Sequence, residues 1–162
     1  MNQVVSLFKN NPETVKVWKS FTTDEPLLSL MKSLCMTPGN KLTCAALLEL
    51  CDFENKSMRL LVTMVKTPLL ALGLTHERIS YFEVMQAASS RGWYATQPLA
   101  AIKLRLVYAD QPGDERLFVP LFGRYNWLTL KMIREHGALL VRPTAQKKYK
   151  PEDYFAFTIP RD

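Results

Sequence analysis

The first group of residues that could bind a ligand lies between Thr43 and Lys66. A helix over residues 55–66 would bury an apolar stripe repeating every three or four positions. With a helix over 43–51 and a three-residue turn before it, the segment has the layout of a helix-turn-helix. Its outer face would offer groups that contact phosphates and base edges, namely Asn55, Lys56, Arg59, Thr63 and Lys66. The alternative is two ordinary amphipathic helices with solvated cations.

A second group spans residues 124–150, where seven cations face a single carboxylate, an excess equal to the net charge of +6 for the whole chain. Such a patch suits nucleic acid or an acidic protein surface, although a merely solvated surface is the alternative. Aromatic side chains among the cations could stack on the bases of a single strand, and Tyr149 is a better surface candidate than Trp127. The candidate residues here are Arg124, Arg142, Lys147, Lys148, Tyr149 and Lys150.

The sequence contains no Gly-x-Ser-x-Gly elbow, no phosphate loop ending in Gly-Lys-Ser/Thr and no His-Glu-x-x-His. Neither histidine lies in a recognisable nucleophile or general-base motif. Cysteine and histidine are zinc ligands, but Cys35, Cys44, Cys51 and His76 include no chelating pair two to four residues apart. We therefore expect no catalysis, no metal and no cofactor.

The composition is that of a globular protein, with 162 residues, 48% of them hydrophobic and 22% charged. One domain, or one domain with a helical appendage, can bury a core at this length. Three cysteines, an odd number, favour a reducing compartment, and we expect a cytoplasmic protein without a signal peptide. The longest apolar run, residues 60–74, is interrupted by Lys66, Pro68 and Gly73, so we expect no membrane span.

Helical signals dominate the first half of the chain. Helices are expected over residues 13–21, 26–35, 43–51 and 55–66, and a short strand over 69–72. The clearest signal is Ser80-Tyr81-Phe82-Glu83, a capping box that opens a helix ending at Gly92.

The second half alternates with a period of two, which is typical of strands. Strands are expected at 102–108, 116–122, 127–133, 138–142 and 154–159, with Pro120 at an edge or bulge and a turn at 135–137. Two alternatives remain open: a short helix from Leu99, and a helix bracketed by Asn126 and Gly137.

These elements predict an α+β protein. A helical region over residues 1–75, with the helix-turn-helix at 43–67, would precede an antiparallel β meander with one capped helix over 76–162.

Residues 79–161 resemble a class of small uncharacterised bacterial proteins. The likeness rests on the capped helix, on the strand and turn Leu104-Arg105-Leu106-Val107-Tyr108-Ala109-Asp110-Gln111-Pro112, and on the closing strand. No activity is attached to that class, so the resemblance implies a fold and no chemistry.

We therefore expect a non-enzymatic nucleic-acid-binding accessory protein, in a context such as a phage or plasmid. The alternative is an adaptor or inhibitor that docks on another protein through the basic meander surface.

Overall fold

The structure is a computed structural model that describes residues 17–43, 46, 50, 59–122, 129–144 and 148–160. Its strands are β1 (Lys19–Thr23), β2 (Asn40–Leu42), β3 (Leu60–Pro68), β4 (Ile79–Ser80), β5 (Leu117–Pro120), β6 (Thr129–Glu135), β7 (Ala138–Thr144), β8 (Lys148–Tyr149) and β9 (Tyr154–Thr158). Its helices are α2 (Leu27–Met36), the short 3₁₀ helix η1 (Leu69–Leu72), α4 (Tyr81–Ser90) and α5 (Pro98–Val107).

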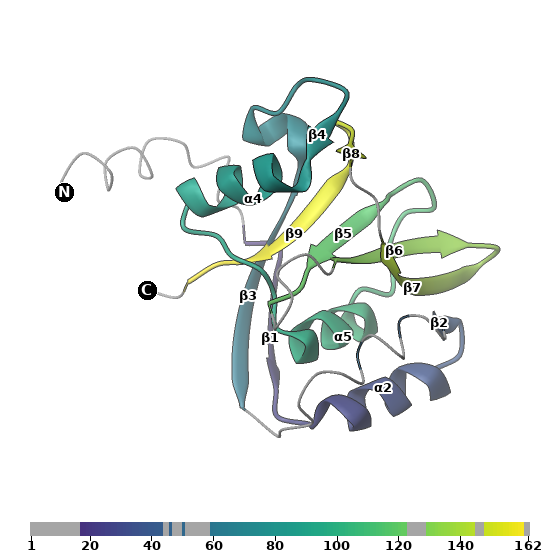
Figure 1. Cartoon of the computed structure of the whole chain (residues 1–162). Coiled ribbons are helices and arrows are strands. Elements are labelled where there is room, and N and C mark those ends of the chain that lie inside the picture. The colour runs from purple at the N-terminus through teal and green to yellow at the C-terminus, as the bar shows by residue number, and fades with distance from the viewer. Residues whose placement is uncertain are drawn as a thin grey trace.

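The described strands form one seven-stranded mixed sheet in the order β1-β3-β9-β5-β6-β7-β2, and β4 and β8 form a separate ribbon (Figure 1). The pairs β5–β9 and β2–β7 are parallel and the other neighbours in the large sheet are antiparallel. Because strands from both sides of residue 75 share this mixed sheet, the expected arrangement of a helical part followed by an antiparallel meander is wrong.

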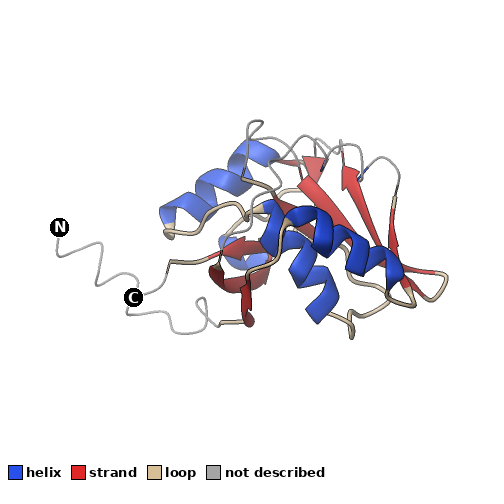
Figure 2. Cartoon of the chain, turned by 90° about the horizontal axis from the view of Figure 1, so that it is seen from below, coloured by secondary structure: helices blue, strands red, loops and turns tan. Residues whose placement is uncertain are grey.

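Two hydrophobic clusters cover opposite faces of the sheet. On one face α2 and α5 pack against strand residues that include Met64, Leu117 and Met132. On the other face α4, η1 and the β4–β8 ribbon enclose Val65 and an aromatic group around Phe118. Figure 2, viewed from below Figure 1, shows the helices layered against the strands.

The predicted helix-turn-helix is wrong because residues 60–68 form β3. Met64 and Val65 are both buried, on opposite faces, since β3 lies inside the sheet between β1 and β9. A strand buried on both faces reads as a continuous apolar run, which also satisfies a helical stripe. Residues 51–58, which would hold the turn and the first turn of the second helix, lie outside the described residues.

The helix expected over 13–21 is also wrong where it can be compared, since β1 begins at Lys19. The helix expected over 43–51 falls mostly outside the described residues. Residues 69–72 form η1 in place of the expected strand.

The strand expected over 102–108 is wrong, and the competing helix is right. Pro98 occupies the first turn of α5, where its missing N–H costs nothing. The helix is buried on nearly all sides, so it lacks the single polar face that marks a surface helix. Strand β5 lies between β9 and β6 and is not an edge strand, but Pro120 at its end lies beyond the two residues that pair with β9.

Elements with strong local signals are where they were expected. Helix α2 and strand β9 match the predicted ranges closely. In α4 the Ser80 hydroxyl accepts from the Glu83 amide while Glu83 accepts from the Ser80 amide, and Gly92 adopts a φ of 76°. His136 and Gly137 have φ values of 51° and 79°, the signature of a two-residue type I′ turn between β6 and β7.

The capping box gives a direct test of α4. Ser80→Ala removes the acceptor of the Glu83 amide and should lower the free energy of unfolding by about 1 kcal/mol. Ser89→Ala, an exposed change inside the same helix, should leave stability unchanged or slightly raised. Chemical denaturation of both variants decides the point, and equal midpoints for Ser80→Ala and the unmodified protein would contradict this reading of the cap.

Candidate anion-binding face

Residues proposed for the helix-turn-helix do not form a common surface in the structure. Arg59 is exposed just before β3, and Thr63 lies on β3 with its hydroxyl 3.5 Å from that of Ser20. Lys66 projects from the same strand into a partly buried polar network. Asn55 and Lys56 lie outside the described residues.

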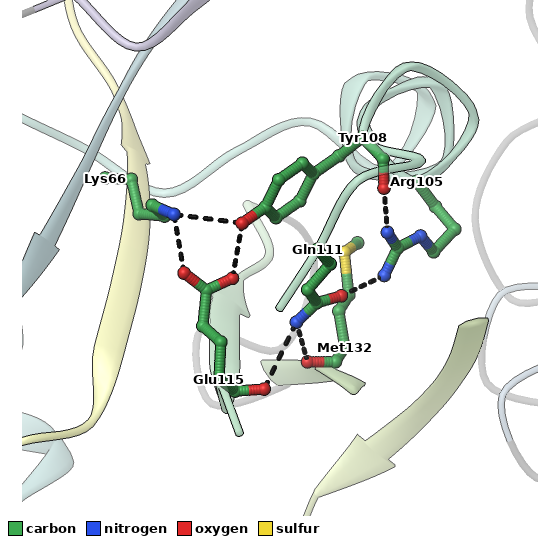
Figure 3. Close-up of polar contacts among 6 residues, drawn as sticks. All are labelled: Lys66, Arg105, Tyr108, Gln111, Glu115 and Met132. Atoms are coloured by element: carbon green, nitrogen blue, oxygen red, sulfur yellow. Dashed lines mark hydrogen bonds and ion pairs between the residues drawn. The ribbon is translucent and has the colours of Figure 1, made fainter. Parts of the chain in front are cut away.

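The network around Lys66 is closed by Tyr108 and Glu115 (Figure 3). The Lys66 ammonium lies 2.5 Å from Glu115 Oε1 and donates to the Tyr108 hydroxyl at 2.9 Å. Tyr108 in turn donates to Glu115 Oε2 at 2.6 Å. The ammonium also lies 5.1 Å and 5.3 Å from the ring centroids of Trp18 and Tyr154. Lys66 is therefore occupied inside the fold and is not a phosphate ligand.

The second half of the network holds the connection between α5 and β5. The buried guanidinium of Arg105 donates to the Gln111 side chain and to the Tyr108 carbonyl. Gln111 Nε2 donates to the Met132 carbonyl at 2.8 Å, and Arg134 donates to the Gln111 carbonyl at 3.0 Å. This connection is thereby fastened to β6.

Burial shifts two pKa values in this network. It lowers the pKa of Arg105 to about 10. It raises the pKa of Tyr108, helped by the hydrogen bond that Tyr108 donates to Glu115. Arg105 therefore stays charged and Tyr108 protonated at neutral pH, which is the state in which every bond above forms. The cluster therefore stabilises the fold by linking β3, the connection between α5 and β5, and β6.

A different group of cations lies on the face of the sheet that carries the aromatic cluster. Arg116 directly precedes β5, Lys131 is on β6 and Arg142 is on β7, and we call these three residues the basic face. Lys131 on β6 lies directly opposite Phe118 on β5 and, on its other side, directly opposite Arg142 on β7. Since neighbours directly opposite one another point to the same side, Lys131 and Arg142 share the face that holds the aromatic cluster and not the face under α2 and α5.

Lys131 is the half-buried centre of the basic face. Its ammonium lies 5.8 Å from the ring centroid of Phe118. Burial, and then the charges of Arg142 and Arg116, lower the pKa of Lys131. Burial is the larger cause, and the two neighbouring cations act in the same direction.

The charges of Asp153 and Glu135 offset part of the lowering of the Lys131 pKa, but both carboxylates form ion pairs with other residues. Asp153, buried to 1% exposure, forms an ion pair with Arg116 and accepts from the Lys150 amide at 2.9 Å. Among the described residues, no aspartate or glutamate forms an ion pair with Lys131 or Arg142.

The neighbouring ribbon carries the other predicted residues. Lys148 and Lys150 are exposed at β8 and just after it. Tyr149, predicted to lie at the surface, is instead 1% exposed, because its ring packs edge-on against Phe118 and Phe155 at 5.0 Å and 4.9 Å. Arg124 and Lys147 lie outside the described residues.

Other features of the described chain offer less chemistry. A shallow depression of about 470 Å³ on α4 is lined by Phe82, Met85, Gln86, Ser89 and Ser90 and carries no charged side chain. No three histidine, cysteine, aspartate or glutamate side chains in the described ranges lie close enough together to hold a metal ion. Within the same ranges, no helix is long and apolar enough to cross a membrane.

Comparison of the chain with protein-family models, with curated proteins and with solved structures finds no match.

Of the three residues of the basic face, only Arg142 was among the candidate residues named from the sequence, and Lys131 and Arg116 were not. The signal for Lys131 was present: two alternating segments joined by a two-residue turn at His136-Gly137 place position 131 opposite position 142. Arg116 had no such signal, because its neighbours depend on which strand lies beside β5.

The Lys66–Glu115 pair predicts a stability effect. Glu115→Gln leaves the half-buried ammonium without its counter-ion and should lower the free energy of unfolding by about 3 kcal/mol. Adding Lys66→Met to this variant should restore part of the loss, because no unpaired charge then remains. Glu77→Gln, at an exposed position, should change stability by less than about 0.5 kcal/mol. Denaturant titrations compare the variants, and a neutral Glu115→Gln would contradict the role given to the network.

Burial of Tyr149 predicts a pH dependence. Burial raises the pKa of Tyr149 from 10.0 to about 12 in the folded chain. The unfolded chain therefore releases this proton first, so the contribution is complete below pH 10 and is lost as the pH rises towards about 12. Tyr149→Phe should flatten the fall in unfolding free energy over this window, whereas Tyr94→Phe, at an exposed position, should leave it as in the unmodified protein. Unfolding curves taken at successive pH values measure the slope, and an unchanged slope in Tyr149→Phe would count against the buried hydroxyl.

Proposed function

We propose that this protein binds nucleic acid through the basic face and acts as a non-enzymatic accessory protein. The observation that carries the proposal is the juxtaposition of Lys131 and Arg142 directly across two strands. Two positive charges directly opposite each other repel and destabilise a sheet. An anion bound between Lys131 and Arg142 would be attracted by both side chains and would offset this repulsion.

The surroundings of the pair favour a polyanion over a single small ion. Arg116 adds a third cation directly before β5, where it forms an ion pair with Asp153. Lys148 and Lys150 are exposed on the ribbon beside the aromatic cluster. A chain of phosphates could contact several of these cations at once and release counterions as it does so. A cytoplasmic location fits this proposal, because nucleic acids and free thiols such as that of Cys35 occur there together.

Charge removal on the basic face tests the proposal. Lys131→Gln and Arg142→Gln should each weaken binding of labelled oligonucleotides and reduce the slope of log affinity against log salt by about 1. Lys32→Gln removes an exposed cation from α2, on the opposite side of the sheet, and should change neither quantity. Fluorescence anisotropy over a salt series gives both numbers.

Two outcomes would overturn the proposal. The first is the absence of oligonucleotide binding even at low salt. The second is binding that polyglutamate displaces as effectively as nucleic acid does, since an acidic protein would then be the better ligand class for the same cations.

A further inference from the structure

An aliphatic pair lies beside the cations of the basic face. Ile133 and Leu140 are directly opposite each other across β6 and β7. Each is two residues along its strand from Lys131 or Arg142, so all four side chains point to the same side of the sheet. Cations and aliphatic groups therefore form adjacent rows on one surface of the β6–β7 hairpin.

Neither aliphatic side chain belongs to a core cluster in the part of the chain that the structure describes. Among the described residues, the two hydrophobic clusters take Leu130, Met132 and Val141 from this hairpin, and neither cluster includes Ile133 or Leu140. Both are half-buried and not fully exposed. In Figure 1 the hairpin extends away from α4, which covers the same side of the sheet further along.

We infer that the ligand of the basic face is a single-stranded nucleic acid, with a phosphate at Lys131 and Arg142 and an unpaired base against Ile133 and Leu140. This inference rests on the proposed function and narrows it. The two rows lie next to each other, within reach of one nucleotide, and they match its charged and apolar parts.

A duplex does not fit this arrangement. Its bases are stacked and paired, so only base edges and the backbone reach a protein surface. In a single strand the bases can be splayed out and their faces covered by side chains. The apolar row therefore gains more contact from the exposed face of an unpaired base than from the base edges of a duplex.

Three probes separate base contact from charge alone. They are a labelled oligothymidylate of about 12 nucleotides, a strand of equal length made of abasic sites, and a duplex of matched length. The oligothymidylate should bind several-fold more tightly than either of the others at the same salt concentration. Equal binding of the abasic strand or of the duplex overturns the inference and leaves the proposed function intact. No binding of any probe removes both.

Variants of the aliphatic row give an independent test. Leu140→Thr introduces a β-branched side chain, which suits a strand, but removes apolar surface, and it should weaken oligothymidylate binding several-fold. Its salt slope should remain unchanged because no phosphate contact is lost. Leu140→Ile keeps the apolar contact and should bind as the unmodified protein does.

The matched control is Leu61→Thr, which alters an exposed leucine on β3. It should not change binding, and the melting temperature of each variant shows that the fold is retained. If Leu140→Thr folds and binds oligothymidylate as tightly as Leu61→Thr does, the contact assigned to the base is wrong.

Discussion

Two consecutive side chains directly before β5, those of Glu115 and Arg116, hold the sheet together. Glu115 points to one face of the sheet and forms an ion pair with Lys66 on β3. Arg116 points to the other face and forms an ion pair with Asp153, which directly precedes β9. Alternation along a strand makes this possible, because neighbouring residues point to opposite faces. Strand β5 is thus fixed beside β9, and β6 and β7 follow from β5 through hairpin registers. The position of every cation on the basic face depends on this fastening.

The two cation groups differ in how their charge is balanced. Lys66 forms an ion pair with Glu115 inside the protein, so its charge stabilises the fold. Lys131 and Arg142 face each other, with burial working against the central charge. A protein surface retains such a repulsive arrangement at some cost to stability, and an anionic ligand offsets that cost when it binds. This contrast separates the structural network from the face to which we assign function.

The sequence predicted those elements whose signals are local. The capping box at Ser80 and the turn at His136-Gly137 each fix a geometry within four residues, and both are confirmed. Strand β3 and helix α5 were misassigned because burial on several sides erases the periodicity that distinguishes a helix from a strand. The same limit applies to the site residues. The position of Lys131 opposite Arg142 follows from the local hairpin. The burial of Tyr149 depends on Phe118 and Phe155, which lie on strands distant in the sequence or on another sheet, so no local signal predicts it.

The place of β9 in the sheet has a consequence for how the chain reaches its fold. β9 follows every other described strand in the sequence, yet it lies between β3 and β5 near the middle of the sheet. During synthesis β1 and β3 leave the ribosome before β5, β6 and β7, and no backbone ladder joins these two groups of strands directly. The ladder across the sheet becomes continuous only when β9 emerges and pairs with both β3 and β5. The sheet therefore forms late in synthesis. Until β9 is available, β3 and β5 each have an unpaired strand edge, and such edges are prone to aggregation and are bound by chaperones.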